Sequence, residues 1–213
     1  MVISHSKKFI FIHVYKVAGT SIRAALRPFN DKNLFFSPLS SKWKMMTGEY
    51  PIIFSDDFPH HIRAKELREE LPDEIFDEYF KFAFVRNPWS WQVSLYNYAR
   101  MYPSHHQYEI TNRLGSFENY LKWRTEHEPR FQKHFVTDDD GTLIVDHIGK
   151  IENLEDNFRV ICRKAGLGDI KLPHKNISTK RNYLEFYSQE TIDLVADFWS
   201  EDIDMFGYDK PEL

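Results

Sequence analysis

The chain has 213 residues, of which 28 are basic and 32 acidic, and its formal net charge is −4. This length suits one domain with a substantial core, and this charge argues against a general nucleic-acid-binding surface. The single cysteine, Cys162, excludes an internal disulfide framework and favours a reducing compartment. No apolar run reaches the roughly 18 to 20 residues that cross a bilayer, so we expect a cytoplasmic protein without an integral membrane segment.

The first unit along the chain is a strand, a turn and a helix. Residues 9–14 form a nearly continuous apolar run, which is typical of a strand buried on both faces of a parallel sheet. Lys16 and Gly19 interrupt this run. The segment over residues 21–27 is amphipathic and predicts a helix that ends before Pro28.

The turn between this strand and this helix is suited to a phosphate-like anion. A helix N-terminus has unpaired backbone N–H groups and a partial positive charge. Lys16 adds a cation, and Thr20 and Ser21 add hydroxyl groups. An ordinary capped turn would also explain these residues. The order differs from the nucleotide-triphosphate loop GxxxxGK[ST], because Lys16 precedes Gly19, the only glycine of the turn.

The next stretch is irregular and then helical. Residues 29–58 have no clear period, and one strand is expected in them at residues 51–54. Apolar residues at helical spacing predict a helix over residues 64–71. Asp73 is placed to cap a second short helix that runs to Phe80.

A second strand and helix repeat the layout of the first unit. Residues 82–85 predict the strand, and Pro88 begins a helix that runs to about Arg100. Arg86 stands at the end of the strand, and Ser94 lies on the helix. Two anion-binding turns on one chain suggest a ligand with phosphate-like groups at both ends.

The remaining sequence is predicted to be mostly helical. Gly166 stands where a left-handed cap follows a helix, and Ser188 is placed to cap a last helix. The turn at residues 138–141 predicts a hairpin that leads into a strand at residues 142–145. The other expected segments are helical pieces at 116–123 and 128–134 and a polar loop at 171–183.

Strands that alternate with helices indicate an α/β fold with a central, mainly parallel sheet flanked by helices. The sequence contains no repeat, no low-complexity tract and no linker rich in Gly, Ser or Pro, so we expect a single domain over residues 1–213. Both anion-binding turns follow a strand, at the edge of the sheet where the ligands of such folds sit.

Two segments resemble the motifs of one enzyme superfamily. HVYKVAGTSI, which begins at His13, resembles the 5′-phosphosulfate loop HxPKTAGTSI of the carbohydrate sulfotransferases. FVRNPWSWQVSLY, which begins at Phe84, resembles their 3′-phosphate motif FVRNPWDRLVSLY. Further segments are similar to the family and occur in the order that the family has. They are the helix start at His61, between the two motifs, then DHIGKIENLEDNF, and then the pair LPHKNIS and DIDMFGY. The resemblance covers roughly residues 7–208 and implies a three-layer, P-loop-NTPase-like fold.

The resemblance implies a sulfotransferase with 3′-phosphoadenosine 5′-phosphosulfate (PAPS) as co-substrate. Lys16 would neutralise charge on the leaving phosphate, and Arg86 and Ser94 would hold the 3′-phosphate. The acceptor is expected to be a hydroxyl of a carbohydrate or of another hydroxylated small molecule, and no metal is expected. The residues that would hold the 5′-phosphate are Ala18, Gly19, Thr20 and Ser21.

Transfer to a hydroxyl calls for a base with a pKa near neutrality, and histidine is suited to this role. His61 matches the family's position at a helix start, and His60 is the alternative. His105 and His106 lack a third ligand at a workable spacing, which favours a solvated loop over a metal site.

Three positions depart from the family's pattern: Tyr15 replaces a proline, Val17 a hydroxyl residue and Trp91 an arginine. Two alternatives stay open. One is a nucleotide kinase or hydrolase in which residues 143–146 supply a Mg²⁺-binding aspartate. The other is a non-catalytic domain that binds a nucleotide or a glycan. The aromatic residues that are candidates for stacking on acceptor sugar rings are Trp43, Trp123, Tyr102, Tyr108 and Phe131.

Overall fold

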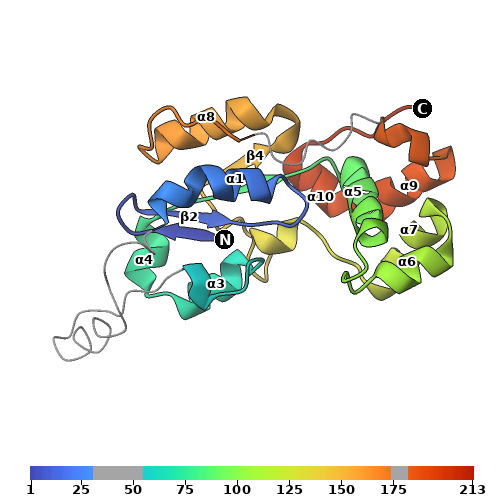
Figure 1. Cartoon of the computed structure of the whole chain (residues 1–213), viewed down its shortest axis with the longest axis horizontal. Coiled ribbons are helices and arrows are strands. Elements are labelled where there is room, and N and C mark those ends of the chain that lie inside the picture. Colours follow the sequence, from blue (N-terminus) through green and yellow to red (C-terminus); the bar gives the residue numbers. More distant parts are fainter. Residues whose placement is uncertain (31–54, 174–181) are drawn as a thin grey trace.

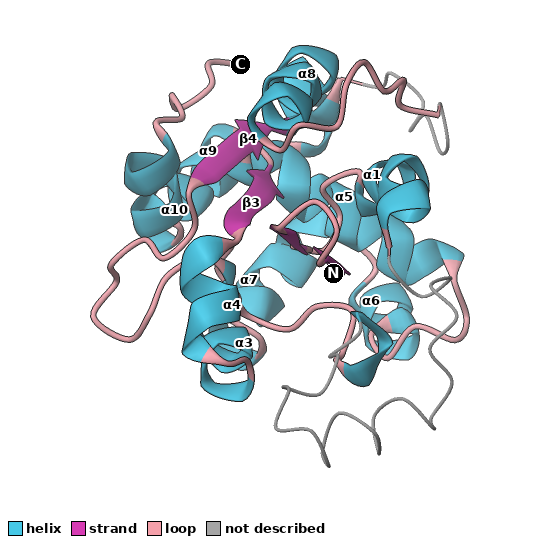
Figure 2. Cartoon of the chain, turned by 90° about the vertical axis from the view of Figure 1, so that its left-hand side faces the viewer, coloured by secondary structure: helices cyan, strands magenta, loops and turns pink. Residues whose placement is uncertain are grey.

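The computed structural model describes residues 1–30, 55–173 and 182–213. Its centre is a four-stranded sheet with the order β1-β2-β3-β4. The first strand runs antiparallel to the second, and the other three are parallel to one another. Figures 1 and 2 show how the strands lie between the helices. The strands are β1 (Val2–Ser4), β2 (Phe9–Ile12), β3 (Phe80–Val85) and β4 (His147–Lys150).

Helices cover both faces of this sheet. Figures 1 and 2 show α1 and α8 on one face and α3 and α4 on the other, which gives three layers. Among the described residues, no helix is long and apolar enough to cross a membrane. The helices beside the sheet are α1 (Gly19–Leu26), α3 (Ala64–Glu70), α4 (Asp73–Glu78) and α8 (Leu154–Lys164). The others are α5 (Pro88–Met101), α6 (Tyr108–Leu114), α7 (Phe117–His127), α9 (Gln189–Phe198) and α10 (Ser200–Phe206).

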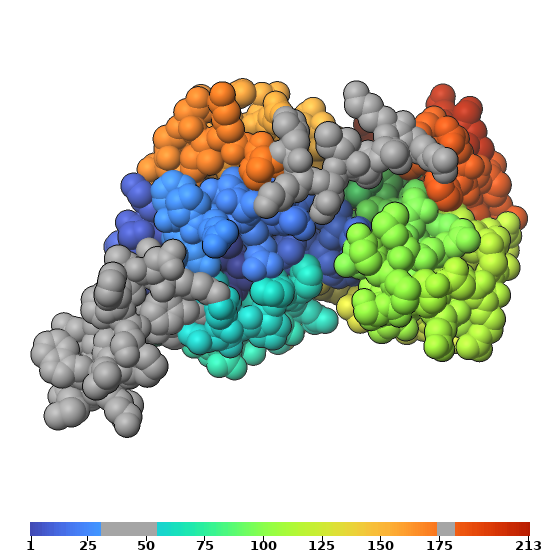
Figure 3. All heavy atoms as spheres, viewed as in Figure 1, coloured from blue at the N-terminus to red at the C-terminus, as the bar shows by residue number. Residues whose placement is uncertain are grey.

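The apolar core of the described residues forms two clusters. The first surrounds the sheet, where the rings of Phe11 and Phe82 stack across β2 and β3 at 5.3 Å between centroids. The second lies among α5, α7 and α9 and includes three fully buried tryptophans. Tyr15 packs against both clusters. Figure 3 shows the surfaces of these two parts of the chain side by side along the long axis.

The predicted α/β fold with a central, mainly parallel sheet is confirmed. The strands predicted at 9–14 and 82–85 are parallel neighbours, with Ile12 beside Ala83 near their carboxyl ends. The helix expected from Pro88 is α5, in which Asn87 accepts a hydrogen bond from the backbone N–H of Ser90. Helix α9 is capped by Ser188 as predicted.

One strand prediction is wrong. Residues 142–145 form no strand; Leu143 makes only an isolated antiparallel bridge with Thr137. The strand β4 begins after this apolar run, at His147, where the chain reaches the open side of β3. Because β4 is an edge strand, pairing with one neighbour defines it rather than an apolar sequence.

Smaller differences concern helix positions. Residues 128–134 hold no α-helix, only the start of a 3-10 turn over Lys133–Phe135, and Asp73 is the first residue of α4 rather than its cap. Strand β1 and helix α6 were not predicted. The strand expected at residues 51–54 lies outside the described residues.

Candidate active site

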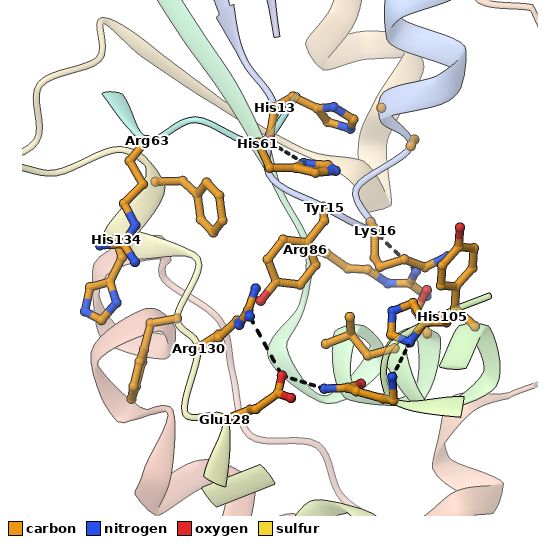
Figure 4. Close-up of a pocket in the computed structure, with 18 of the residues that line it drawn as sticks. His13, Tyr15, Lys16, His61, Arg63, Arg86, His105, Glu128, Arg130 and His134 are labelled. Carbon is orange, nitrogen blue, oxygen red and sulfur yellow. Dashed lines mark hydrogen bonds and ion pairs between the residues drawn. The ribbon is translucent and has the colours of Figure 1, made fainter. Parts of the chain in front are cut away.

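A cavity of about 850 Å³ opens at the carboxyl edge of the sheet. Its wall is formed by the loop after β2, the segment before α3, the end of β3 with α5, and residues 128–135. Figure 4 shows this wall, with Lys16 and Arg86 close together and Arg63 and His134 across from them. All the predicted site residues line this cavity: Lys16, Ala18, Gly19, Thr20, Ser21, His61, Arg86 and Ser94.

The loop between β2 and α1, residues 13–18 and called the lysine loop below, has an unusual backbone. Lys16 and Ala18 both adopt the left-handed conformation, with φ of 64° and 60°. Non-glycine residues in this region cost on the order of 1–3 kcal/mol each and cluster at functional sites. The loop delivers the chain to the N-terminus of α1, whose first turn leaves backbone N–H groups without carbonyl partners in the helix. The loop therefore joins an anion-attracting helix end to a lysine.

Gly19 allows the loop to lie against the ring of His13. A Cβ atom at Gly19 would stand 1.6 Å from Nε2 of His13, so no side chain fits there. His13 is itself buried, and its ring lies 4.4 Å from that of His61 between centroids. Burial lowers the pKa of His13 to about 2, with smaller contributions from His61, the N-terminus and Arg23, so its ring is neutral.

Lys16 carries its charge into the cavity without a carboxylate partner among the described residues. Its Nζ lies 3.9 Å from the centre of the Tyr98 ring, a cation–π contact. Burial and, to a smaller extent, the charge of the nearby Arg86 together lower the pKa of Lys16 to about 8. Two neighbouring cations repel each other, so an anion between them would stabilise the site.

Arg86 stands at the end of β3 and is held in place by polar contacts. Its Nε donates to Oγ of Ser90 at 2.8 Å, and its Nη1 lies 3.5 Å from the carbonyl oxygen of Lys16. The guanidinium therefore connects the loop after β2 with the first turn of α5. Ser94 lies one helical turn beyond Ser90 on the same helix and also lines the cavity.

The two adjacent histidines take different positions. Nδ1 of His61 lies 2.9 Å from the carbonyl oxygen of His13. Because a carbonyl only accepts, Nδ1 carries the hydrogen, and Nε2 of the neutral ring is left as an acceptor. Although His61 is partly exposed, desolvation by the surrounding residues lowers its pKa. His60 does not line the cavity, and its carbonyl oxygen accepts from the ammonium of Met1 at 2.8 Å.

Two of the three departures from the sulfotransferase motifs contact each other. Trp91 is fully buried, and its Nε1 donates to the carbonyl oxygen of Tyr15 at 3.0 Å. The two rings lie 5.1 Å apart between centroids. Trp91 thus packs beneath the loop and supports it through Tyr15. Val17 is fully buried and packs in the sheet cluster.

Much of the cavity wall across from Lys16 and Arg86, called the far wall below, was not predicted from the sequence. Among the predicted acceptor-stacking aromatics that the structure describes, only Phe131 lines it. His105 and His106 line the cavity too, and His106 lies 3.3 Å from Glu128. No group of three potential metal ligands occurs within the ranges 1–30, 55–173 and 182–213. The cavity residues that were not predicted include Arg63, Gln107, Arg124, Glu128, Arg130 and His134.

Arg124 is the most buried of these unpredicted residues. It is 1% exposed and lies over the rings of Trp91 and Tyr120, each 5.9 Å from its Cζ. No local motif marks it, because its place in the wall follows from the packing of α7 against α5. Nothing in the spacing of residues 117–127 separates it from a surface arginine.

The aspartate of the kinase alternative lies away from the cavity. Asp146 precedes β4, so it stands at the amino end of the parallel strands, opposite to the loop. Its carboxylate accepts from the backbone N–H of Lys81 at 2.7 Å and lies 3.1 Å from Nζ of the same residue. This side chain has a structural role and does not face the lysine loop.

Comparison with known proteins places the chain in a family. An uncharacterised protein of Archaeoglobus fulgidus is 29% identical over 118 residues, which are 55% of this chain and 92% of that protein. No solved structure matches this chain. The model of the sulfotransferase family matches residues 1–209. The chain therefore belongs to the sulfotransferase family.

Proposed function

We propose that this chain transfers a sulfuryl group from PAPS to a hydroxyl of a carbohydrate or another hydroxylated small molecule. One observation carries the proposal: the lysine loop, the Arg86 strand end and a histidine with an accepting Nε2 all face the same cavity. We also propose that residues 1–213 act as one domain, which the extent of the family match supports. A cytoplasmic location, favoured by the single cysteine, stays a prediction.

The chemistry of the cavity wall fits a donor with phosphate-like groups at two ends. Backbone N–H groups at the start of α1, with the hydroxyls of Thr20 and Ser21, would hold the 5′-phosphate. Arg86 and Ser94 would hold the 3′-phosphate, because a guanidinium donates paired, charge-assisted hydrogen bonds to phosphate oxygens. Lys16, in the loop that leads into α1, would contact the oxygen that bridges the 5′-phosphate and the sulfuryl group.

The proposed step is an in-line displacement at sulfur. The acceptor oxygen forms a bond to sulfur while the bond from sulfur to the bridging oxygen breaks. The electron pair stays on the 5′-phosphate of 3′,5′-adenosine bisphosphate, where Lys16 offsets the charge. The acceptor's proton passes to Nε2 of His61, which the carbonyl of His13 keeps in the accepting tautomer.

The two alternatives have less support. The nucleotide kinase or hydrolase alternative relied on Asp146, and this aspartate is paired with Lys81 at the opposite edge of the sheet. A domain that only binds a nucleotide or a glycan would not need a base beside the donor. His61 lines the cavity, and the hydrogen bond from its Nδ1 to the carbonyl of His13 leaves Nε2 as an acceptor.

A sulfate-transfer assay tests the proposal. Radiolabelled PAPS is incubated with the protein and a panel of glycans and hydroxylated metabolites, and labelled acceptor is measured. Lys16→Ala and His61→Gln are expected to abolish transfer. His60→Gln is the matched control, because it alters the neighbouring histidine outside the cavity and should retain activity. Independently, 3′,5′-adenosine bisphosphate should raise the Tm of the wild-type protein. No rise at millimolar nucleotide would overturn the donor assignment.

A further inference from the structure

Gln132 forms a pair of hydrogen bonds with the backbone of Arg86. Its Oε1 accepts from the backbone N–H of Arg86 at 2.9 Å, and its Nε2 donates to the backbone carbonyl of Arg86 at 2.8 Å. The side chain thus pairs with Arg86 as another strand would, just beyond the end of β3. Gln132 is fully buried and does not line the cavity.

The backbone of Gln132 is anchored from the opposite side by α10. The carboxylate of Asp202 accepts from the backbone N–H of Gln132 at 2.8 Å and from that of Lys133 at 2.8 Å. Asp202 is fully buried, so these bonds are shielded from water. Helix α10 therefore fixes Gln132, and Gln132 fixes the backbone of Arg86.

The position of the Arg86 guanidinium depends on this backbone. Its only direct side-chain partner among the described residues is Ser90, and its contact with the carbonyl of Lys16 is long, at 3.5 Å. A shift of the Arg86 backbone would move the guanidinium relative to Ser94 and to the lysine loop. We infer that Gln132 is a positioning residue that sets donor affinity by holding Arg86 where it meets the 3′-phosphate; this inference rests on the proposed function.

The two hydrogen bonds to the backbone of Arg86 require a side chain at residue 132 that both accepts and donates. A substitution whose ability to donate depends on pH therefore tests the inference. In Gln132→Glu, a protonated carboxyl group can accept from the N–H of Arg86 and donate to its carbonyl, as the amide does. An ionised carboxylate only accepts, so one oxygen would face the Arg86 carbonyl without a hydrogen between them. Acid should therefore restore the pairing in this variant.

The experiment compares two nucleotides over a range of pH. The dissociation constants of 3′,5′-adenosine bisphosphate and of adenosine 5′-phosphate are measured for wild type and Gln132→Glu from pH 5.5 to 8.5. Only the first nucleotide has a 3′-phosphate. Each variant value is divided by the wild-type value at the same pH, which cancels the titration of the nucleotide, of Asp202 and of the cavity histidines. Gln189→Glu, an exposed glutamine on α9, is the matched control.

We expect the bisphosphate to bind Gln132→Glu about tenfold more weakly than wild type at high pH and nearly as tightly at low pH. Adenosine 5′-phosphate should show no such change. Equal weakening of both nucleotides, or unchanged bisphosphate binding at every pH, would overturn the inference. If Gln132→Glu does not fold, the uncharged Gln132→Met decides by the same comparison of the two nucleotides. A wild-type protein that does not bind the bisphosphate overturns the proposed function, and this inference with it.

Discussion

The close approach of Gly19 to His13 predicts a large effect from a single methyl group. In Gly19→Ala the new Cβ would lie 1.6 Å from Nε2, 2.3 Å from Cδ2 and 2.5 Å from Cε1 of His13. The ring has little room to move, because His13 is 8% exposed and lies between Phe11 and His61. Overpacking in a core typically costs about 1–3 kcal/mol, and an overlap of this depth should reach about 3 kcal/mol.

A double-mutant cycle separates this overlap from other effects of the substitutions. His13→Ala removes the ring and loses its packing, but it also opens the space that a methyl group at residue 19 requires. The double variant should therefore be about 2–3 kcal/mol more stable than the sum of the two single changes predicts. Urea unfolding of the four proteins gives the free energies of unfolding. Additive single effects, within about 0.5 kcal/mol, would show that the two residues are not in contact.

Three further outcomes are expected. The pKa of His13 is lowered to about 2 in the folded chain, so below pH 6.5 the unfolded chain binds a proton on this ring that the folded chain does not. The free energy of unfolding should therefore fall by about 1.4 kcal/mol per pH unit as the pH drops below 6.5. The urea midpoint of His13→Gln should fall less steeply over the same range. The pKa of Lys16 is lowered to about 8, whereas Glu118 raises that of Lys122, so acetic anhydride at pH 8 should acetylate Lys16 before Lys122. Mass spectrometry measures the acetylation of each lysine, and 3′,5′-adenosine bisphosphate should reduce that of Lys16. Asp146→Ala removes the carboxylate that accepts from the backbone N–H of Lys81 and should cost about 2 kcal/mol in urea unfolding. Bisphosphate affinity measured by calorimetry should nevertheless stay within twofold of wild type; a larger loss of affinity would favour the kinase alternative.

The parts of the fold that were predicted correctly are those with local signals. The apolar runs of β2 and β3, and Pro88 at the start of α5, are readable within a few residues. Strand β4 was missed because its definition lies in pairing with β3, while the more apolar residues before it form no strand: Leu143 is exposed, and Val145 is buried without strand pairing. An edge strand with one neighbour needs little apolar surface, so hydrophobicity does not mark it.

The candidate site shows the same division. The near wall, which comprises Lys16, residues 18–21 and Arg86, follows two short motifs, and these residues do meet at one cavity. The far wall was not predictable, because Arg124 reaches the cavity through the packing of α7 against α5, and Arg130 through the irregular segment that follows α7. The sequence also left open whether His60 or His61 is the candidate base. One contact distinguishes the two: the carbonyl of His13 faces the ring of His61.

Tyr15 belongs to both apolar clusters, one on each side of the cavity. Its ring lies 5.5 Å from that of Phe135, in the sheet cluster, and 5.1 Å from that of Trp91, in the helical cluster, between centroids. Because Tyr15 precedes Lys16 in the chain and its carbonyl accepts from Trp91, this part of the loop is fixed to both clusters at once. The aromatic ring that stands where sulfotransferases carry a proline therefore ties the position of the neighbouring Lys16 to the packing of both clusters.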